Sequence, residues 1–198
     1  MAVARVHDVA AALLAETGSV TTMKLQKLVY YSQAWHLVFH GEPLFGDAIE
    51  AWPQGPVTRS LYDKHRRQRQ VSAWPAGDGS KLTATERDTL RWVLNKYGAF
   101  SAESLSQMTH MEAPWRIARG VLGSNEHSST PIDRQQMKHF YARQRAAVDV
   151  AVSQAAASAA IEGVELDDEW QETLRSVASG SVSADDAVAE EIRRAARS

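Results

Sequence analysis

The chain has 198 residues, a formal net charge of −2 and 44% apolar residues, which is typical of a soluble globular protein with one or two domains. It contains no cysteine, which excludes structural disulfides, thiolate metal sites and cysteine nucleophiles. The sequence shows neither a signal-peptide pattern at its N-terminus nor an apolar run long enough to span a membrane, so we expect a cytoplasmic protein.

The first part of the chain reads as helices separated by short turns. Apolar residues at helical spacing predict a helix over residues 3–15 that ends at Gly18. A second helix follows, capped by Thr21 or Thr22, with one apolar face that continues until Gly41 stops it.

The next segment predicts a change in backbone conformation. Residues 48–52 alternate between apolar and polar and indicate a brief strand or extended segment. Pro56 is then expected to open a helix at its first position, with Val57 facing inward. A basic run, residues 64–69, follows that helix, and residues 72–81 are rich in Gly, Ser and Pro and predict a surface loop.

The middle of the chain carries several helix-start signals. Thr83 and Glu86 have the spacing of a capping box, and Ser101 is placed to cap a shorter helix. Pro114 predicts another helical turn, which ends near Gly120.

A long helix is predicted next. Thr130, Pro131 and Asp133 read as its cap, its first residue and its capping-box carboxylate. Because no breaker occurs over residues 132–161, this helix can run straight into an alanine-rich segment, for roughly 45 Å at 1.5 Å per residue. Eight of the fifteen residues in 146–160 are alanine, the strongest helix former.

The long helix ends on a short polar motif. Ser158 and Glu162 stand four residues apart, so they share one helix face, and Gly163 is a natural left-handed stop. Beyond it, Asp167 predicts the cap of a helix that ends at Gly180, and Ser183 predicts the cap of a last helix.

These elements predict a mainly α fold. We expect a helical domain over residues 1–141, with at most a short β element, and a three-helix tail over residues 142–198. The charge supports two units, since residues 1–145 carry a net +5 and residues 146–198 a net −7, although simple attraction between the two halves would give the same pattern. The tail has few large apolar residues, so it is expected to pack on the first unit or to fold against a partner.

The first domain resembles a known family. The run from Lys24 to Val57 is similar to the Panacea domain, a mainly helical module of bacterial and phage-borne antitoxins and of an adaptor that delivers a toxin to a protease. The resemblance covers about residues 5–141. The motif positions that carry it are Lys24, Leu25, Gln26, Lys27, Tyr30, Trp35, Trp52, Gly55 and Pro56. The apolar ones fit a buried helix face, whereas a solvated face or capping contacts would explain the polar ones.

The tail resembles a second family. Ser158, Glu162 and Gly163 match the inhibitory motif of VbhA-type antitoxins of Fic toxins, and the resemblance extends over about residues 146–196. It implies that the glutamate reaches the nucleotide site of the toxin and pairs with an arginine that would otherwise hold the γ-phosphate of ATP. The apolar residues expected to contact the partner are Val148, Val152, Ile161, Trp170 and Leu174.

Other functions find less support in the sequence. His36 and His40 stand four apart, but the sequence lacks the further ligands of a zinc site, so we expect no metal and no cofactor. We expect no enzymatic activity either, because the chain contains no nucleophile elbow, no phosphate loop and no Fic catalytic signature. The basic run 64–69 leaves contact with operator DNA as an alternative, although no recognition-helix motif accompanies it.

The sequence therefore predicts an antitoxin. Its partner is expected to be a Fic-type AMP-transferase, which Glu162 keeps from binding ATP productively. Two alternatives remain. The first is a Panacea antitoxin or proteolysis adaptor that neutralises an unrelated toxin through residues 1–141, and the second is a DNA-binding repressor of its own operon.

Overall fold

The computed structural model describes residues 3–123, 125–163, 167–178, 182 and 184–195. The protein is mainly helical, as its sequence predicts, and the chain divides into two compact units, Met1–Tyr141 (unit 1) and Ala142–Ser198 (unit 2). The described helices of unit 1 are α1 (Val6–Thr17), α2 (Thr22–His40), α3 (Arg59–His65), α4 (Ala84–Tyr97), α5 (Ala102–Met111) and α6 (Ala113–Arg119), with a 3-10 turn at Gly79–Lys81. The first residues of α7 (Arg134–Ile161) also belong to unit 1.

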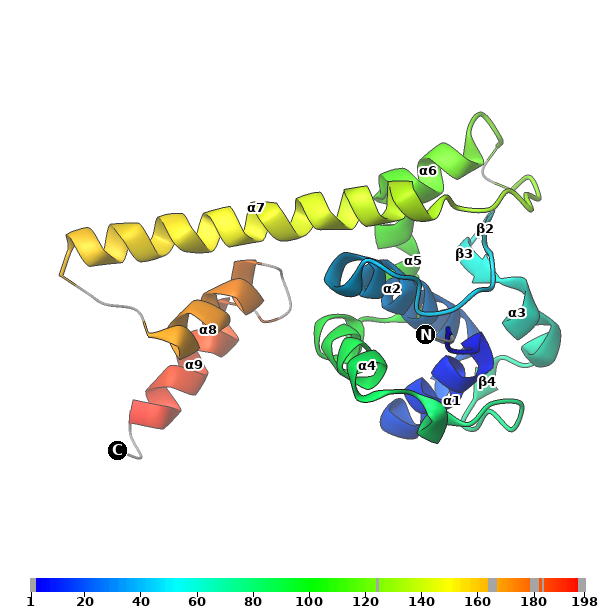
Figure 1. The fold of residues 1–198 in the computed structure, drawn as a ribbon, viewed down its shortest axis with the longest axis horizontal. Helices are drawn as coiled ribbons and strands as arrows, with labels where there is room; N and C mark the ends of the chain where they lie inside the picture. The colour runs from blue at the N-terminus through cyan, green and yellow to red at the C-terminus, as the bar shows by residue number, and fades with distance from the viewer. Residues whose placement is uncertain (1–2, 124, 164–166, 179–181, 183, 196–198) are drawn as a thin grey trace. The chain divides into compact units, whose positions relative to one another are not determined.

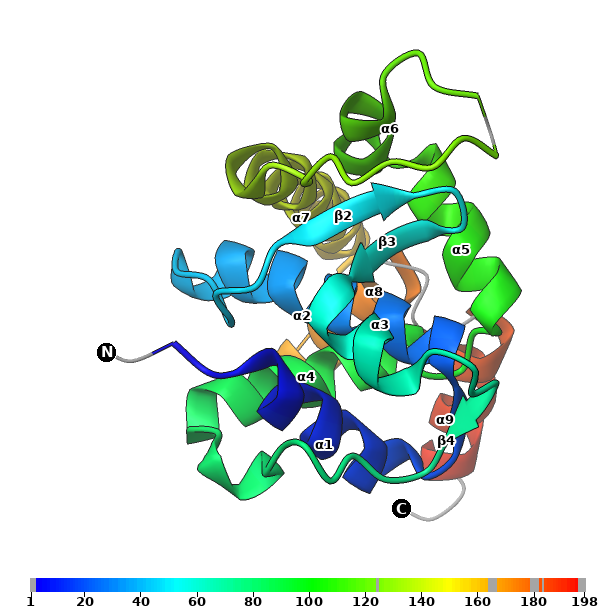
Figure 2. The same ribbon diagram turned by 90° about the vertical axis from the view of Figure 1, so that its right-hand side faces the viewer.

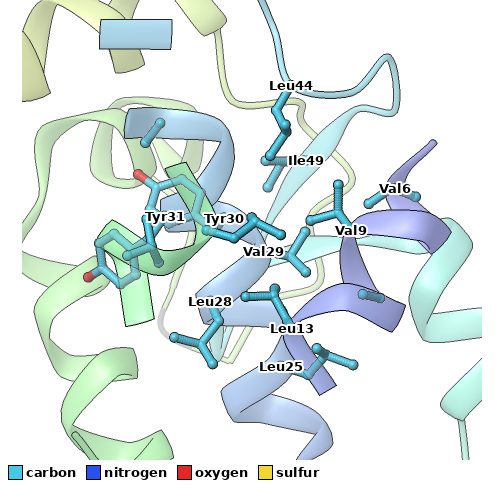
Figure 3. Close-up of a cluster of buried hydrophobic side chains, with 14 of the residues drawn as sticks. Val6, Val9, Leu13, Leu25, Leu28, Val29, Tyr30, Tyr31, Leu44 and Ile49 are labelled. Atoms are coloured by element: carbon cyan, nitrogen blue, oxygen red, sulfur yellow. The ribbon is translucent and has the colours of Figure 1, made fainter. Parts of the chain in front are cut away.

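Helix α2 lies in the middle of unit 1, with α1, α4, α5 and β3 (Gly55–Thr58) packed around it (Figures 1 and 2). Every residue from Leu25 to Leu37 is buried. The prediction of a single buried face was therefore wrong, because a helix with neighbours on all sides has no face left for water. The apolar members of this stretch form the centre of the core together with residues of α1 such as Val9 and Leu13 (Figure 3).

Two small antiparallel sheets complete unit 1. Strand β1 (Val20–Thr21) pairs with β4 (Gln70–Val71), and β2 (Ile49–Trp52) pairs with β3 in a hairpin whose register sets Ala51 opposite Pro56. The extended segment predicted near β2 is thus a strand. The helix predicted to start at Pro56 was wrong: Pro56 and Val57 lie in β3, and α3 begins only at Arg59. A proline suits this strand because β3 pairs only with β2 among the described strands, and such an edge strand tolerates a residue that has no N–H to donate.

Most predicted helix ends are confirmed. Thr21 accepts a hydrogen bond from the Lys24 N–H, Thr83 and Glu86 form a capping box, and Ser101 caps α5. Helix α1 ends at Gly18, α2 at Gly41 and α6 at Gly120.

The predicted start of α7 needs a correction. Asp133 itself caps this helix by accepting from the Gln136 N–H. Thr130 and Pro131 are not helical: the Thr130 carbonyl accepts from the Ala51 N–H, and Pro131 forms a bridge with Glu50. Thr130 and Pro131 thus bond to the edge of β2 that does not pair with β3, although local propensity assigns them to the helix.

The predicted surface loop 72–81 is packed against α1. Trp74 is buried in it, and its Nε1 donates to Nδ1 of His7 at 3.0 Å. The backbone at Gly77 comes so close to α1 that an added Cβ would lie 1.9 Å from the His7 carbonyl oxygen. The loop therefore contributes to the core of unit 1.

Unit 2 contains the rest of α7 and the helices α8 (Asp168–Ala178) and α9 (Ala184–Ala195). Helix α7 continues without a break through the alanine-rich segment, and Asp167 caps α8 as predicted by accepting from the Trp170 N–H. The stops and caps predicted at Gly180 and Ser183 lie outside the described residues. A search of the described helices found none with the length and apolar character needed to cross a membrane.

Candidate functional site

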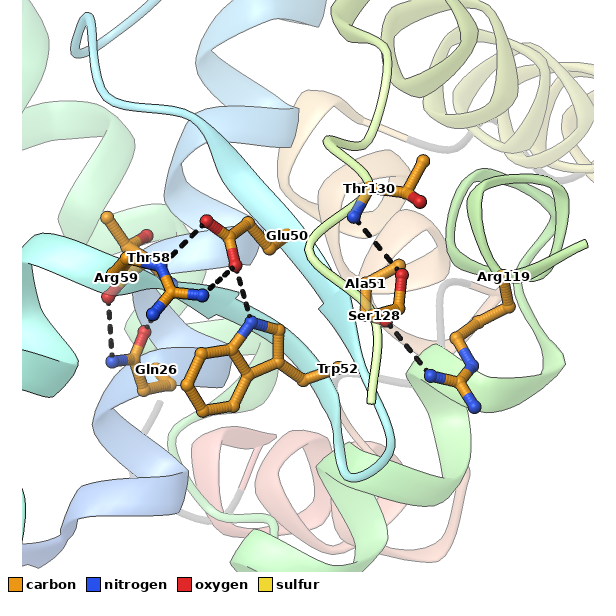
Figure 4. A network of polar contacts seen from close by, with 9 residues as sticks. All are labelled: Gln26, Glu50, Ala51, Trp52, Thr58, Arg59, Arg119, Ser128 and Thr130. Atoms are coloured by element: carbon orange, nitrogen blue, oxygen red, sulfur yellow. Dashed lines mark hydrogen bonds and ion pairs between the residues drawn. The ribbon is translucent and has the colours of Figure 1, made fainter. Parts of the chain in front are cut away.

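Two buried glutamines of α2 hydrogen-bond through their side-chain amides to the backbone N–H and carbonyl groups of other segments. The Gln26 side chain accepts from the Thr58 N–H at 2.8 Å and donates to the Thr58 carbonyl at 3.2 Å (Figure 4). Its Nε2 also lies 2.9 Å from Nε2 of His65. Two turns further along, Gln33 pairs with the N–H and the carbonyl of Phe45 in the same way, at 3.1 Å each. These buried amides attach irregular backbone to the central helix, so their polarity serves the architecture.

The side-chain amine of Lys27 is buried. Among the described residues, no carboxylate contacts it. Its side chain is 1% exposed, and Nζ donates to the Pro56 carbonyl at 3.2 Å. Burial lowers the pKa of Lys27 to about 7, because the charged amine loses its hydration. Gly55, at φ 99°, leaves room for it: an added Cβ there would lie 2.7 Å from Nζ. Lys27 and Gly55 thus form one packing unit.

The remaining Panacea-motif side chains also join elements of unit 1. Lys24 donates to the Gly98 carbonyl at 2.6 Å, and Trp35 Nε1 donates to the Tyr97 hydroxyl at 3.0 Å. Leu25 is fully buried, and Trp52 donates to Glu50, which in turn holds Arg59 at 3.1 Å (Figure 4). None of these contacts has the geometry of a catalytic centre.

A buried carboxylate that sequence reasoning missed lies between α5 and α6. Glu112 accepts hydrogen bonds from Tyr141 at 2.5 Å and from Tyr31 at 3.2 Å, and the Tyr30 hydroxyl lies 3.2 Å from that of Tyr141. Burial raises the pKa of Glu112 to about 7, and the two tyrosine hydrogen bonds oppose this rise. The only sequence signal was its position two residues before Pro114, where a helix start is expected.

The predicted inhibitory motif lies at the end of α7. Ile161 is the last helical residue, and the Glu162 N–H still bonds to the carbonyls of Ala159 and Ser158 at 3.0 and 3.3 Å. Ser158 and Glu162 are both exposed, and Gly163 adopts the left-handed conformation at φ 82°. Among the residues that the structure describes, none pairs with the Glu162 carboxylate. A carboxylate near the C-terminus of a helix opposes the helix dipole, so the dipole does not stabilise Glu162 at this position.

The predicted partner-binding residues of unit 2 differ in exposure. Ile161 is 88% exposed and Trp170 39% exposed, whereas Val148 and Leu174 are half-buried. Val152 is 4% exposed, so this surface does not offer it to a partner.

The remaining candidates are a metal site and the basic run. His36 is buried and its Nδ1 lies 2.9 Å from the Thr89 hydroxyl, and a search of the described residues found no cluster that could hold a metal ion. Within the basic run, His65 is buried, while Arg66, Arg67 and Arg69 are exposed in the turn after α3.

Comparison with known proteins bears on unit 1. No curated protein and no solved structure matches the sequence. A family model, described as antitoxin SocA-like, Panacea domain, matches residues 25–116, which run from α2 into α6 and include the hairpin β2–β3. This part of the chain is therefore similar to the Panacea domain of SocA-like antitoxins, as the motif from Lys24 to Pro56 predicts.

Proposed function

We propose that the protein is the antitoxin of a toxin–antitoxin pair, and that unit 2 inhibits a Fic-type AMP-transferase through Glu162. The antitoxin role is supported by the Panacea family match of residues 25–116. The Fic partner is supported by the resemblance of Ser158, Glu162 and Gly163 to the inhibitory motif of VbhA-type antitoxins.

The single observation that carries the role of Glu162 is its exposed carboxylate at the end of a 28-residue helix. Because this position opposes the helix dipole, the residue is better explained by a cation outside the chain. An arginine in the nucleotide site of the toxin supplies that cation, since its planar fork binds a carboxylate through two parallel hydrogen bonds.

In this proposal, Glu162 occupies the arginine that would hold the γ-phosphate of ATP, so that nucleotide binds only in an unproductive pose. Ser158 lies on the same helix face one turn earlier and helps to seat the helix on the toxin. Gly163 lets the chain turn away directly after the glutamate, because its left-handed backbone conformation carries no side-chain penalty.

The test is the Glu162→Gly variant, studied with the protein encoded by the adjacent gene. We expect it to stay bound, with a loss of at most about 1 kcal/mol or about fivefold in Kd, because affinity rests on interface area. AMP transfer by the toxin, followed with labelled ATP, should return to the rate of the free toxin.

A matched control is Asp168→Asn, which also removes one exposed carboxylate from unit 2 and should leave the toxin silent. Full inhibition by Glu162→Gly would show that the glutamate is not the inhibitory group. A neighbouring protein without AMP-transfer activity would instead favour a Panacea antitoxin for an unrelated toxin.

A further inference from the structure

The exposed large apolar side chains of unit 1 are concentrated in one short stretch of the chain. Among its described residues five large apolar side chains are exposed, and four of them lie within residues 111–122. These four, the α6 patch, are between 38% and 104% exposed and are Met111, Ile117, Val121 and Leu122. Single exposed apolar residues are ordinary. Several exposed together, on a domain whose other large apolar side chains are mostly buried, are typical of a contact surface.

A pocket of about 450 Å³ opens beside this patch, lined among others by His110, Trp115, Ile117 and Leu122. Its aromatic wall is held in place. Trp115 Nε1 donates to the Trp52 carbonyl at 3.0 Å, and the His110 ring stacks on Trp115 with a centroid distance of 4.2 Å. A preformed pocket of this kind binds a partner without first ordering its own side chains.

One residue of the pocket wall, His110, has an enclosed polar atom. His110 Nε2 is buried and makes no hydrogen bond, although the ring does bond to the Pro53 backbone. Burial lowers the pKa of His110, so the ring is neutral at pH 7 and the free nitrogen is an acceptor. Because this nitrogen is closed off from solvent, the ring contributes to the wall of the pocket as a neutral group and not as a hydrogen-bonding site.

The charge of the pocket is one-sided. Arg116 and Arg119 line it, and its described lining residues include no carboxylate. The Arg119 guanidinium already donates to the carbonyls of Ala51 and Glu126. Arg116, by contrast, is exposed. A partner that fits should therefore carry negative charge next to its apolar contact.

We propose that this pocket and the α6 patch form the surface through which unit 1 holds the toxin. The occupant is a short acidic segment of the toxin: one apolar side chain fills the pocket and a carboxylate meets Arg116. This assignment rests on the proposed antitoxin function and adds to it, because it gives the Panacea domain its own binding role beside the inhibitory helix of unit 2.

The experiment measures Kd between the full chain and the protein encoded by the adjacent gene, by isothermal titration calorimetry. The double variant Ile117→Asp, Val121→Asp should weaken binding by at least about tenfold, and Arg116→Glu by about tenfold, because each places a carboxylate against an acidic or apolar segment. The matched control is Val3→Asp, which makes the same change at an exposed apolar residue away from the patch and should leave Kd unchanged. The altered side chains are exposed, so thermal melting should be unaffected, and circular dichroism checks this.

Unchanged Kd for the patch variants would overturn the inference. So would a patch that mediates contact between two copies of the chain, seen in sedimentation velocity as a dimer that the double variant dissociates without any loss of toxin affinity. In either case the proposed function still stands if Glu162→Gly releases AMP transfer. If the wild-type chain does not bind the neighbouring protein at all, both proposals fail together.

Discussion

At the scale of single residues, the polar side chains of α2 decide how unit 1 is assembled. Gln26 and Lys27 reach the backbone of β3 from inside the core, and Gln33 reaches that of Phe45. A buried polar group is costly when it loses its partner, so these residues specify which segments pack against α2 and in which register.

The Gln26→Leu variant tests this role. It leaves the Thr58 N–H and carbonyl without their amide partner inside the core, so we expect a loss of about 2–4 kcal/mol in the free energy of unfolding. Urea denaturation measures the change. Gln135→Leu, at an exposed position of α7, is the control and should stay within about 0.5 kcal/mol of wild type. If both variants change the free energy of unfolding equally, the hydrogen bonds of Gln26 do not specifically stabilise the packing of β3 on α2.

Lys27 and Glu112 give the stability of unit 1 a characteristic pH dependence. Glu112 has a raised pKa of about 7, so the folded state holds a proton that the unfolded state releases above pH 4.5, and its contribution is lost as pH rises from 4.5 through 7. Lys27 has a lowered pKa of about 7, so its contribution is present above pH 10.5 and is lost as pH falls from 10.5 through 7.

Urea denaturation at several pH values should separate the two groups. Relative to wild type, Glu112→Gln should remove the decline between pH 4.5 and 7, and Lys27→Met should remove the rise between pH 7 and 10.5. Each variant is the control for the other. If both variants follow the wild-type curve at all pH values, the two groups titrate in the folded state as they do in water.

At the scale of elements, the hairpin β2–β3 connects the Panacea motif to the rest of unit 1. Its tight turn sets Trp52 opposite Gly55, and its strands contact α2 and α5 on one side and α6 on the other (Figure 2). The hairpin, together with α5, therefore connects the buried residues of α2 to α6 and its pocket.

Gly55→Ala is the sharpest test of this element. The new Cβ would require φ 99° and would lie 2.7 Å from Lys27 Nζ and 2.8 Å from Thr109 Oγ1, so we expect a loss of about 2 kcal/mol or more in the free energy of unfolding. Gly46→Ala is the matched control, since nothing lies within 4 Å of its added Cβ, and it should be nearly neutral. Thermal melting of both variants decides: a neutral Gly55→Ala would mean that the hairpin tolerates a shift at Lys27.

At the scale of the whole molecule, the two units have very different cores. The large cluster of buried apolar residues lies entirely within Met1–Tyr141, whereas the described part of unit 2 buries only Val152 and Ala187 among its apolar side chains. Helices α8 and α9 instead keep apolar residues such as Trp170, Val188 and Ile192 at least partly exposed. Unit 1 can therefore bury its own core, and unit 2 depends on further contacts.

Two fragments test this difference. Residues 1–141 should fold alone with a cooperative thermal transition, and residues 142–198 should be only partly helical alone and gain helicity when the toxin is added, because binding offsets the entropy of ordering. Circular dichroism with and without toxin measures both. An adenylylation assay should find inhibition with residues 142–198 and none with residues 1–141. Inhibition by residues 1–141 alone would replace the Fic mechanism with a Panacea-only antitoxin.

The sequence by itself determined the features that depend on neighbouring residues. Helix caps at Thr21, Thr83 and Ser101, the glycine stops and the continuous helix α7 follow from local hydrogen bonds and intrinsic propensity, and the Panacea motif was visible as a linked series of residues.

Only the tertiary structure decided the features that depend on distant segments. Pro56 lies in a strand because β2 pairs with it, and Thr130 is extended because the edge of β2 takes up its carbonyl. Tertiary contacts also bury both faces of α2 and bring Tyr31 and Tyr141 to Glu112, 81 and 29 residues away in the sequence. The α6 pocket likewise depends on the hydrogen bond from Trp115 to the Trp52 carbonyl, which joins residues 63 apart in the sequence. The periodic pattern of a single helix does not predict a hydrogen bond between such distant residues.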